Sequence, residues 1–224
     1  MSNHKDFFDK PLFTIPNYIY ILLLGGFYFF ICNPLLIFFY IITFINANNF
    51  NFSFLFLSLI PLGPSLTALY SSMNKLYREK NINISSYFFS SYKNNFKDSM
   101  KLWLVQLSLL VLFTVDFTYF YAWKSKLGIH IVFALLILYL IILGLYAFPI
   151  NSRFEMKVKD IIILSFYYTF KKFPLTILKA IVIILVFKFT VNIPPLLLLF
   201  LPSAICLLFS HYDEPMLKEI EARK

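Results

Sequence analysis

Long apolar stretches alternate with short polar connections along the whole chain. The apolar stretches cover residues 18–45, 52–76, 99–123, 129–150, 174–191 and 193–210. A helix needs about 20 residues to cross the hydrocarbon core of a bilayer. The pattern therefore predicts an all-α integral membrane protein with about six transmembrane helices. We expect a single membrane domain over residues 1–224, with a polar leader at 1–16 and a cytoplasmic tail at 211–224.

Two of the predicted spans are expected to bend at helix-breaking residues. In the first span, Asn33 and Pro34 predict a kink. In the second, Pro61 and Pro64 each lack a backbone donor and Gly63 bends easily, so we expect the helix to break there. A new helix can begin at once after the break, because Pro64 suits the first turn of a helix. Ser65 or Thr67 is the predicted cap of this new helix. Hydrocarbon cannot satisfy the freed backbone groups, which must face protein or water.

Two polar connections keep a helical period of apolar residues. The first segment, residues 85–98, leads into the third span, and Ser85 or Ser86 is the predicted N-terminal cap of its helix. In residues 158–173 a similar pattern ends before Pro174. Both segments predict amphipathic helices that lie in the membrane interface.

Composition supports the membrane assignment. The chain is 60% hydrophobic, 21% aromatic and only 14% charged, whereas roughly a quarter of the residues are charged in typical soluble proteins. The net charge of +9 comes from Lys and Arg residues in the connections, which indicates topology and not nucleic-acid binding. Cys32 and Cys206 lie in apolar stretches without metal-ligand spacing and are interpreted as small packed hydrophobes.

The positive charges also predict the orientation. If six spans cross and the N-terminus is cytoplasmic, 17 of the 20 Lys and Arg residues fall on the cytoplasmic side. The other three are Lys124, Lys126 and Lys188. This bias predicts a plasma-membrane protein with both termini in the cytoplasm.

Two neighbouring segments carry a family resemblance. They are Leu59-Ile60-Pro61-Leu62-Gly63-Pro64-Ser65-Leu66-Thr67-Ala68-Leu69-Tyr70 and Ser86-Tyr87-Phe88-Phe89-Ser90-Ser91-Tyr92-Lys93-Asn94-Asn95-Phe96-Lys97. In this order they resemble the YesL family of bacterial membrane proteins, a domain of unknown function, most clearly over residues 50–125. The family is associated with Gram-positive bacteria and with genes for carbohydrate ABC importers and glycan-degrading enzymes. The resemblance implies an accessory role in sugar uptake and supplies no catalytic residue.

Asp116 is the one acid inside a predicted span, where a carboxylate is costly unless it is paired, protonated or hydrated. It is either a structural partner of nearby polar groups or part of a solute or proton site. The candidate partners are Thr114, Tyr119, Tyr121, His130 and Lys188.

The helix break has two interpretations as well. A new helix starting near Ser65 presents free donors that suit an anion or sugar hydroxyls; alternatively, the break is a packing kink filled by neighbouring helices. The candidate ligand-binding residues are Asp116, Pro61, Gly63, Pro64, Ser65, Thr67 and His130. The three histidines lack metal spacing and no catalytic motif is present, so we expect no catalytic residue, metal or cofactor.

Three functions remain open. The first is a non-enzymatic accessory membrane protein that associates with the permease subunits of a carbohydrate ABC importer. The second is a small-solute carrier or channel with its site near Asp116 and the break at 61–64, working as a homo-oligomer. The third is a membrane regulator or assembly factor that acts through the predicted interfacial helices. Lipid is a partner in all three, and nucleic acid in none.

Overall fold

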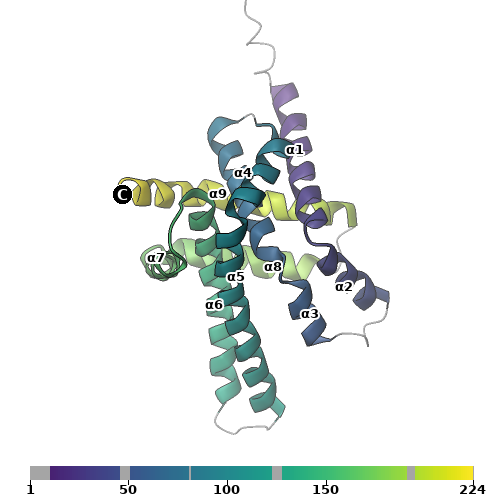
Figure 1. The fold of residues 1–224 in the computed structure, drawn as a ribbon, viewed down its shortest axis with the longest axis vertical. Coiled ribbons are helices and arrows are strands. Elements are labelled where there is room, and N and C mark those ends of the chain that lie inside the picture. The colour runs from purple at the N-terminus through teal and green to yellow at the C-terminus, as the bar shows by residue number, and fades with distance from the viewer. Residues whose placement is uncertain (1–10, 46–50, 81, 123–127, 191–194, 224) are drawn as a thin grey trace, which may run out of the picture.

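The computed structural model describes residues 11–45, 51–80, 82–122, 128–190 and 195–223. All regular secondary structure in these ranges is helical (Figure 1). The helices are α1 (Pro11–Ile31), α2 (Pro34–Ile45), α3 (Phe52–Ser58), α4 (Leu62–Glu79), α5 (Ile84–Ala122), α6 (Ile129–Arg153), α7 (Val158–Lys171), α8 (Phe173–Thr190) and α9 (Pro195–Glu221).

The predicted kink at Asn33 and Pro34 is present as a sharp bend. Helix α1 ends at Ile31, α2 begins at Pro34, and the two axes differ by 84°. The Asn33 side chain stabilises the end of α1, because its Nδ2 donates to the Phe29 carbonyl at 2.6 Å. The first apolar stretch is therefore a broken span or a re-entrant element.

The second apolar stretch is also divided. Helix α3 ends at Ser58, α4 begins at Leu62, and they are bent by 45°. The predicted caps were wrong, because Pro61 is the N-cap residue of α4 and makes no side-chain cap hydrogen bond. The hydroxyls of Ser65 and Thr67 instead donate back to the carbonyls of Leu62 and Gly63, at 2.9 and 3.1 Å.

The predicted interfacial helix at 85–98 is not a separate element. It is the first part of α5, which continues without a break into the apolar third span. No Pro or Gly lies between Ile84 and Ala122, so nothing in the backbone forces an elbow. Neither Ser85 nor Ser86 is the cap, because Asn83 Oδ1 accepts from the Ser86 amide at 3.4 Å.

The second predicted amphipathic helix is confirmed as a separate helix, α7.

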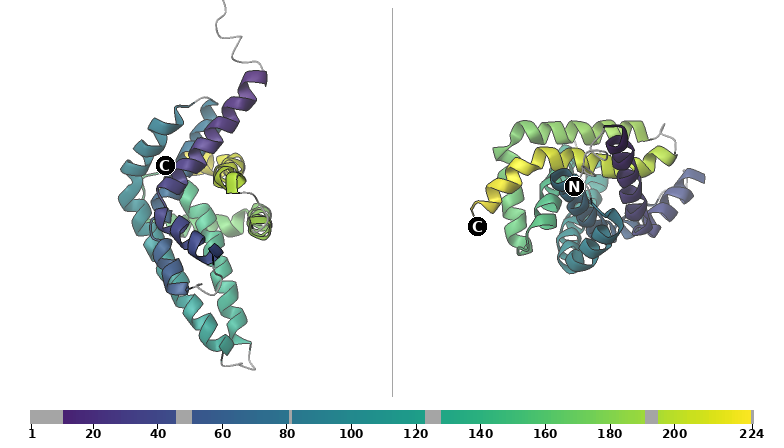
Figure 2. Two further views of the ribbon diagram at one scale, coloured as in Figure 1. Left: turned by 90° about the vertical axis from the view of Figure 1, so that its right-hand side faces the viewer. Right: turned by 90° about the horizontal axis from the view of Figure 1, so that it is seen from above.

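Helices α5 and α6 form a long antiparallel hairpin that projects from the rest of the molecule (Figure 1). Helices α8 and α9 run side by side across this hairpin, on one side of the other helices (Figure 2). Within the described residues α5 and α6 are long and apolar enough to span a membrane, and the count rises to four if each bent pair is one span. Six spans are not reached in this part of the chain, because α8 counts only as a shorter apolar helix, over residues 173–186, and α9 is not among the candidate spans.

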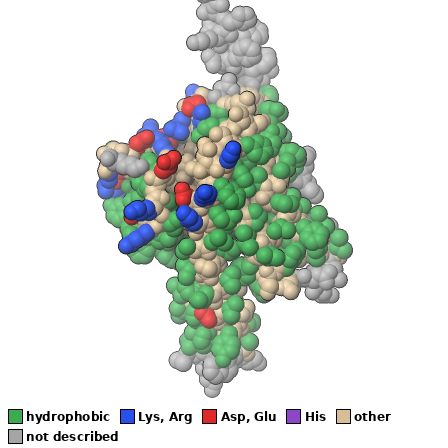
Figure 3. Space-filling view, in the orientation of Figure 1, with side chains coloured by type: hydrophobic (Ala, Val, Ile, Leu, Met, Phe, Trp, Pro, Cys, Tyr) green, Lys and Arg blue, Asp and Glu red, His purple; other side chains and the backbone are tan. Residues whose placement is uncertain are grey.

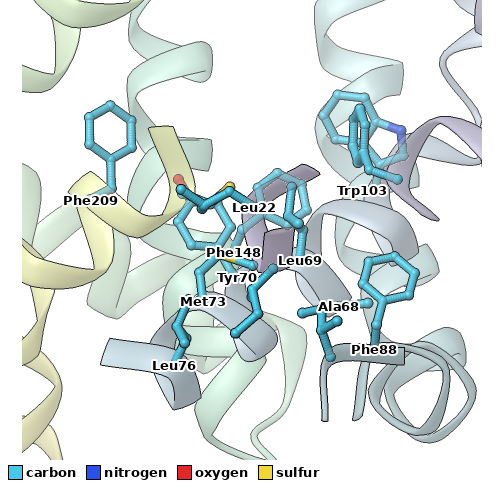
Figure 4. Close-up of a cluster of buried hydrophobic side chains, with 14 of the residues drawn as sticks. Leu22, Ala68, Leu69, Tyr70, Met73, Leu76, Phe88, Trp103, Phe148 and Phe209 are labelled. Atoms are coloured by element: carbon cyan, nitrogen blue, oxygen red, sulfur yellow. The ribbon is translucent and has the colours of Figure 1, made fainter. Parts of the chain in front are cut away.

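The main core lies where α1, α4, α5, α6 and α9 meet. Helix α4 contributes Ala68, Leu69, Met73 and Leu76, all completely buried. Around them pack side chains of the other helices, shown in Figure 4: Leu22, Phe88, Trp103, Phe148 and Phe209. In contrast, the outer faces of α5 and α6 expose large apolar side chains such as Leu112 and Leu135. Such contiguous apolar exposure is expected of helices that contact lipid.

Candidate functional site

The break between α3 and α4 is filled by Trp103 of α5. Its indole Nε1 donates to the Leu59 carbonyl at 2.7 Å, and the same carbonyl accepts from the Leu62 amide at 3.1 Å. A Cβ atom at Gly63 would lie 2.3 Å from Trp103 Cβ, so only glycine allows this contact. The geometry at this point is that of a packing kink, and the ligand hypothesis for Pro61, Gly63 and Pro64 stays a prediction.

This contact gives a direct prediction. Replacing Trp103 by Phe keeps an aromatic ring against Gly63 but removes the indole hydrogen bond to the Leu59 carbonyl, which keeps the bond from the Leu62 amide. A typical intramolecular hydrogen bond contributes about 0.5–1.5 kcal/mol, and we expect the free energy of unfolding in mild detergent to fall by that amount. Exchanging exposed Tyr121 for Phe is the control, with no expected change. Equal stability of W103F and the native chain would contradict this role of the indole.

The two hydroxyl residues at the start of α4 hold other helices together. Asn33 Nδ2 donates to Ser65 Oγ at 2.7 Å and links α1 and α2 to α4. Asn151 Nδ2, in α6, donates to Ser99 Oγ at 2.9 Å and to Thr67 Oγ1 at 3.3 Å, which joins α4, α5 and α6. Ser65 and Thr67 are completely buried, and the contacts the structure gives them are with protein groups.

Asp116 and His130 lie near the projecting end of the α5–α6 hairpin, apart from the break. Asp116 is partly exposed and forms no hydrogen bond or ion pair with another residue in the described part of the chain. His130, at the start of α6, packs edge-on against the rings of Phe117 and Tyr121. Its Nδ1 is buried without a hydrogen-bond partner among the described residues. The structure therefore places the predicted site residues in two groups, with Asp116 and His130 in one and residues 61–67 in the other.

A buried ion pair between α8 and α9 was missed by the sequence analysis. Lys179 Nζ lies 2.7 Å from Asp213 Oδ1 and 2.9 Å from Oδ2, and both side chains have zero exposure. The ammonium also donates to the Leu145 carbonyl at 3.0 Å and lies 3.9 Å from the centre of the Tyr146 ring. Two opposite charges, a carbonyl and a ring face thus form a closed neutral cluster.

A signal for this pair existed in the sequence. Lys179 lies inside the fifth apolar stretch, at 174–191, and Asp213 lies three residues beyond the sixth, at 193–210. A charge within an apolar span requires a partner. Counting Lys179 among the cytoplasmic charges hides this signal.

Charged side chains gather at one end of the molecule, over α7 and the end of α9 (Figure 3). Arg153, at the end of α6, pairs with Glu214 and Glu221 of α9, each at 2.8 Å. Glu219 pairs with Lys171 of α7 and with Arg223. The predicted tail at 211–224 is therefore helical to Glu221 and attached to α6 and α7 by ion pairs.

These pairs predict a pH response. The hydrogen bond from Lys171 lowers the pKa of Glu219, and the same contact raises the pKa of Lys171. The pair therefore contributes to the free energy of folding near neutral pH. This contribution is lost as the pH falls through the lowered pKa of Glu219, and it is also lost as the pH rises through the raised pKa of Lys171. In K171M we expect the pKa of Glu219 to return towards its ordinary value, measured by carboxyl NMR. K157M removes a lysine from the start of α7 as the control.

A polar cleft opens beside this charged end. It has a volume of about 240 Å³ and lies between α4, the first part of α5 and the connection from α6 to α7. Its lining consists almost wholly of hydroxyl, amide and charged groups: Ser71, Tyr87, Ser90, Ser91, Asn94, Asn95, Asn151, Ser152, Arg153, Phe154 and Glu155.

Comparison with known families places the central part of the chain. Residues 29–117 match a family described as "Protein of unknown function, DUF624". The DUF624 match runs from the end of α1 through most of α5, and so includes the break, Trp103 and Asp116. The Lys179–Asp213 pair and His130 lie beyond it. Neither the curated proteins nor the solved structures provide a match.

Proposed function

We propose that this chain is a non-enzymatic accessory membrane protein that associates with the permease subunits of a carbohydrate ABC importer in a Gram-positive bacterium. The observation that carries the proposal is the packing of the helix break. The Leu59 carbonyl, Gly63, Ser65 and Thr67 are engaged by protein groups. This favours a structural kink in a partner-binding protein over a solute site at the break.

Two further features support an accessory role. The segment that resembles the YesL family, 50–125, falls largely within the DUF624 match at 29–117, and that resemblance implies sugar uptake. The polar cleft lies at the charged end, where a partner subunit has access to hydroxyl and amide groups. Polar and charged groups of this kind provide specificity and orientation in protein association.

We also propose that the charged end faces the cytoplasm of a plasma-membrane protein whose two termini are both inside. Of the 17 Lys and Arg residues assigned to one side, 16 support this orientation, because Lys179 is buried against Asp213. Single cysteines at positions 3 and 222, in a chain with Cys32 and Cys206 replaced by Ser, test it in intact cells. Labelling of either position by an impermeant maleimide would refute the orientation.

Co-purification tests the accessory function. The tagged full chain, expressed in its Gram-positive host and extracted in mild detergent, is expected to elute with ABC permease subunits identified by mass spectrometry. N94W places a bulky side chain in the polar cleft and should abolish co-elution, whereas K97W, on the same helix but outside the cleft lining, should not. A chain that elutes alone under these conditions would contradict the proposal.

A specific observation supports the carrier alternative. Asp116 has no partner among the described residues and His130 Nδ1 is buried and unpaired, which is unusual for polar groups at this depth. If the chain is a carrier, D116N is expected to fold normally and to lose solute flux in liposomes. Flux of the native chain that D116N leaves unchanged would remove Asp116 from the site.

A further inference from the structure

An apolar cavity lies between the α4–α5–α6 bundle and the α8–α9 pair. Its volume is about 410 Å³, within the range of about 300–1,000 Å³ found for ligand pockets. The lining is almost entirely aliphatic and aromatic, and includes Leu66 of α4, Leu110 of α5, Ile183 of α8 and Ile205 of α9. Such a cavity favours an apolar ligand.

Gln106 lines this cavity and carries one unpartnered polar atom. Its side chain is 7% exposed, and its Oε1 has no hydrogen-bond partner among the described residues. Its Nε2 donates to the Leu140 carbonyl at 2.8 Å. A carbonyl only accepts, so the amide cannot be turned to exchange the two atoms. The unpartnered atom is therefore an acceptor, and a ligand hydroxyl is a suitable donor for it.

Gly144 of α6 makes room for this amide. A Cβ atom at position 144 would lie 2.5 Å from Gln106 Nε2 and 3.2 Å from Oε1. Both Gly144 and Gln106 line the cavity. The close approach of α5 and α6 at this point holds the amide at the wall.

The charges nearest the cavity are already neutralised. Phe209 and Leu145 line it, and both contact Lys179, through a ring face at 5.5 Å and a carbonyl at 3.0 Å. Lys179 is paired with Asp213, and neither side chain is exposed. The cavity thus offers an ionic head group no free charge, which favours an uncharged ligand.

We propose that the cavity binds an uncharged single-chain lipid whose hydroxyl donates to Gln106 Oε1. A methylene group occupies roughly the volume of a water molecule, about 30 Å³, so a chain of about a dozen carbons fits. A long-chain alcohol or a monoacylglycerol has this chemistry. The binding is independent of any association with an importer.

Photolabelling tests this site. The full chain is placed in phosphatidylcholine nanodiscs with a diazirine derivative of dodecanol, and the labelled peptides are identified by mass spectrometry. Label is expected on cavity-lining segments of α5, α6 and α8, and unlabelled dodecanol should compete for it. The methyl ether of dodecanol lacks the donor and should compete about tenfold more weakly, as for the loss of one hydrogen bond of about 1.4 kcal/mol.

Two variants separate this site from general lipid contact. I183W fills the cavity and should reduce labelling at least about fivefold, whereas I184W, on the adjacent exposed position, should not. Q106L removes the acceptor and should abolish the preference for the alcohol over the ether. Equal competition by alcohol and ether in the native chain, or equal labelling of I183W and I184W, would overturn the proposal. The ether comparison needs no variant, so it decides even if Q106L fails to fold.

Discussion

Replacing Asp213 by Ala is expected to lower the free energy of unfolding by about 3–5 kcal/mol, the usual cost of leaving one partner of a buried ion pair uncompensated. Lys179 would remain with zero exposure, and its only other polar contact within the described chain would be the Leu145 carbonyl. The ring face of Tyr146 offsets a small part of this cost. Unfolding of the purified chain in mild detergent, followed by helix content during titration with a denaturing detergent, measures the loss.

Two further variants show whether the loss comes from the buried charge. E221A removes an exposed acid that also pairs across helices, and its cost should stay below about 1 kcal/mol. The double variant K179M/D213L replaces both charges by apolar groups and is expected to recover most of the stability. A double variant as unstable as D213A would show that packing, and not charge, is the cause.

The second large effect is expected at Gly26, where α1 crosses α9. A Cβ atom at this position would lie 1.6 Å from the Leu199 carbonyl oxygen, which is a backbone atom and cannot rotate away. G26A must therefore separate the two helices, at a cost of about 1–3 kcal/mol or more. The same denaturant titration measures it, and protection of the α1 and α9 amides from hydrogen exchange should fall with it.

Gly25 provides the matched control one residue earlier on the same helix. A Cβ atom there would lie 2.9 Å from Ser203 Oγ and 3.1 Å from Met73 Cε, the ends of side chains that can move. Alanine is also favoured over glycine in a helix by about 1 kcal/mol. G25A should therefore remain close to the native stability. Equal losses in G25A and G26A would mean that the backbone contact with Leu199 is not what limits the packing.

Much of the fold followed from local patterns in the sequence. Apolar stretches longer than 20 residues require helices in lipid, and α6 begins at Ile129 as predicted. Pro34 disfavours the continuation of a helix, and the chain bends there. Such features depend on residues close together in the chain, so they can be read without knowing the tertiary structure.

The tertiary structure decided what those patterns leave open. The sequence could not show that Trp103 of α5 would donate to the Leu59 carbonyl, because the two residues are 44 positions apart. Nor could it show that Lys179 and Asp213, on different helices, would meet. The continuity of α5 through the amphipathic segment was also missed, since an apolar period is the same in an interfacial helix and in the start of a span. Which side chains pair, and in which direction each helix runs, depend on which helices pack together. That packing is set by contacts between residues distant in sequence.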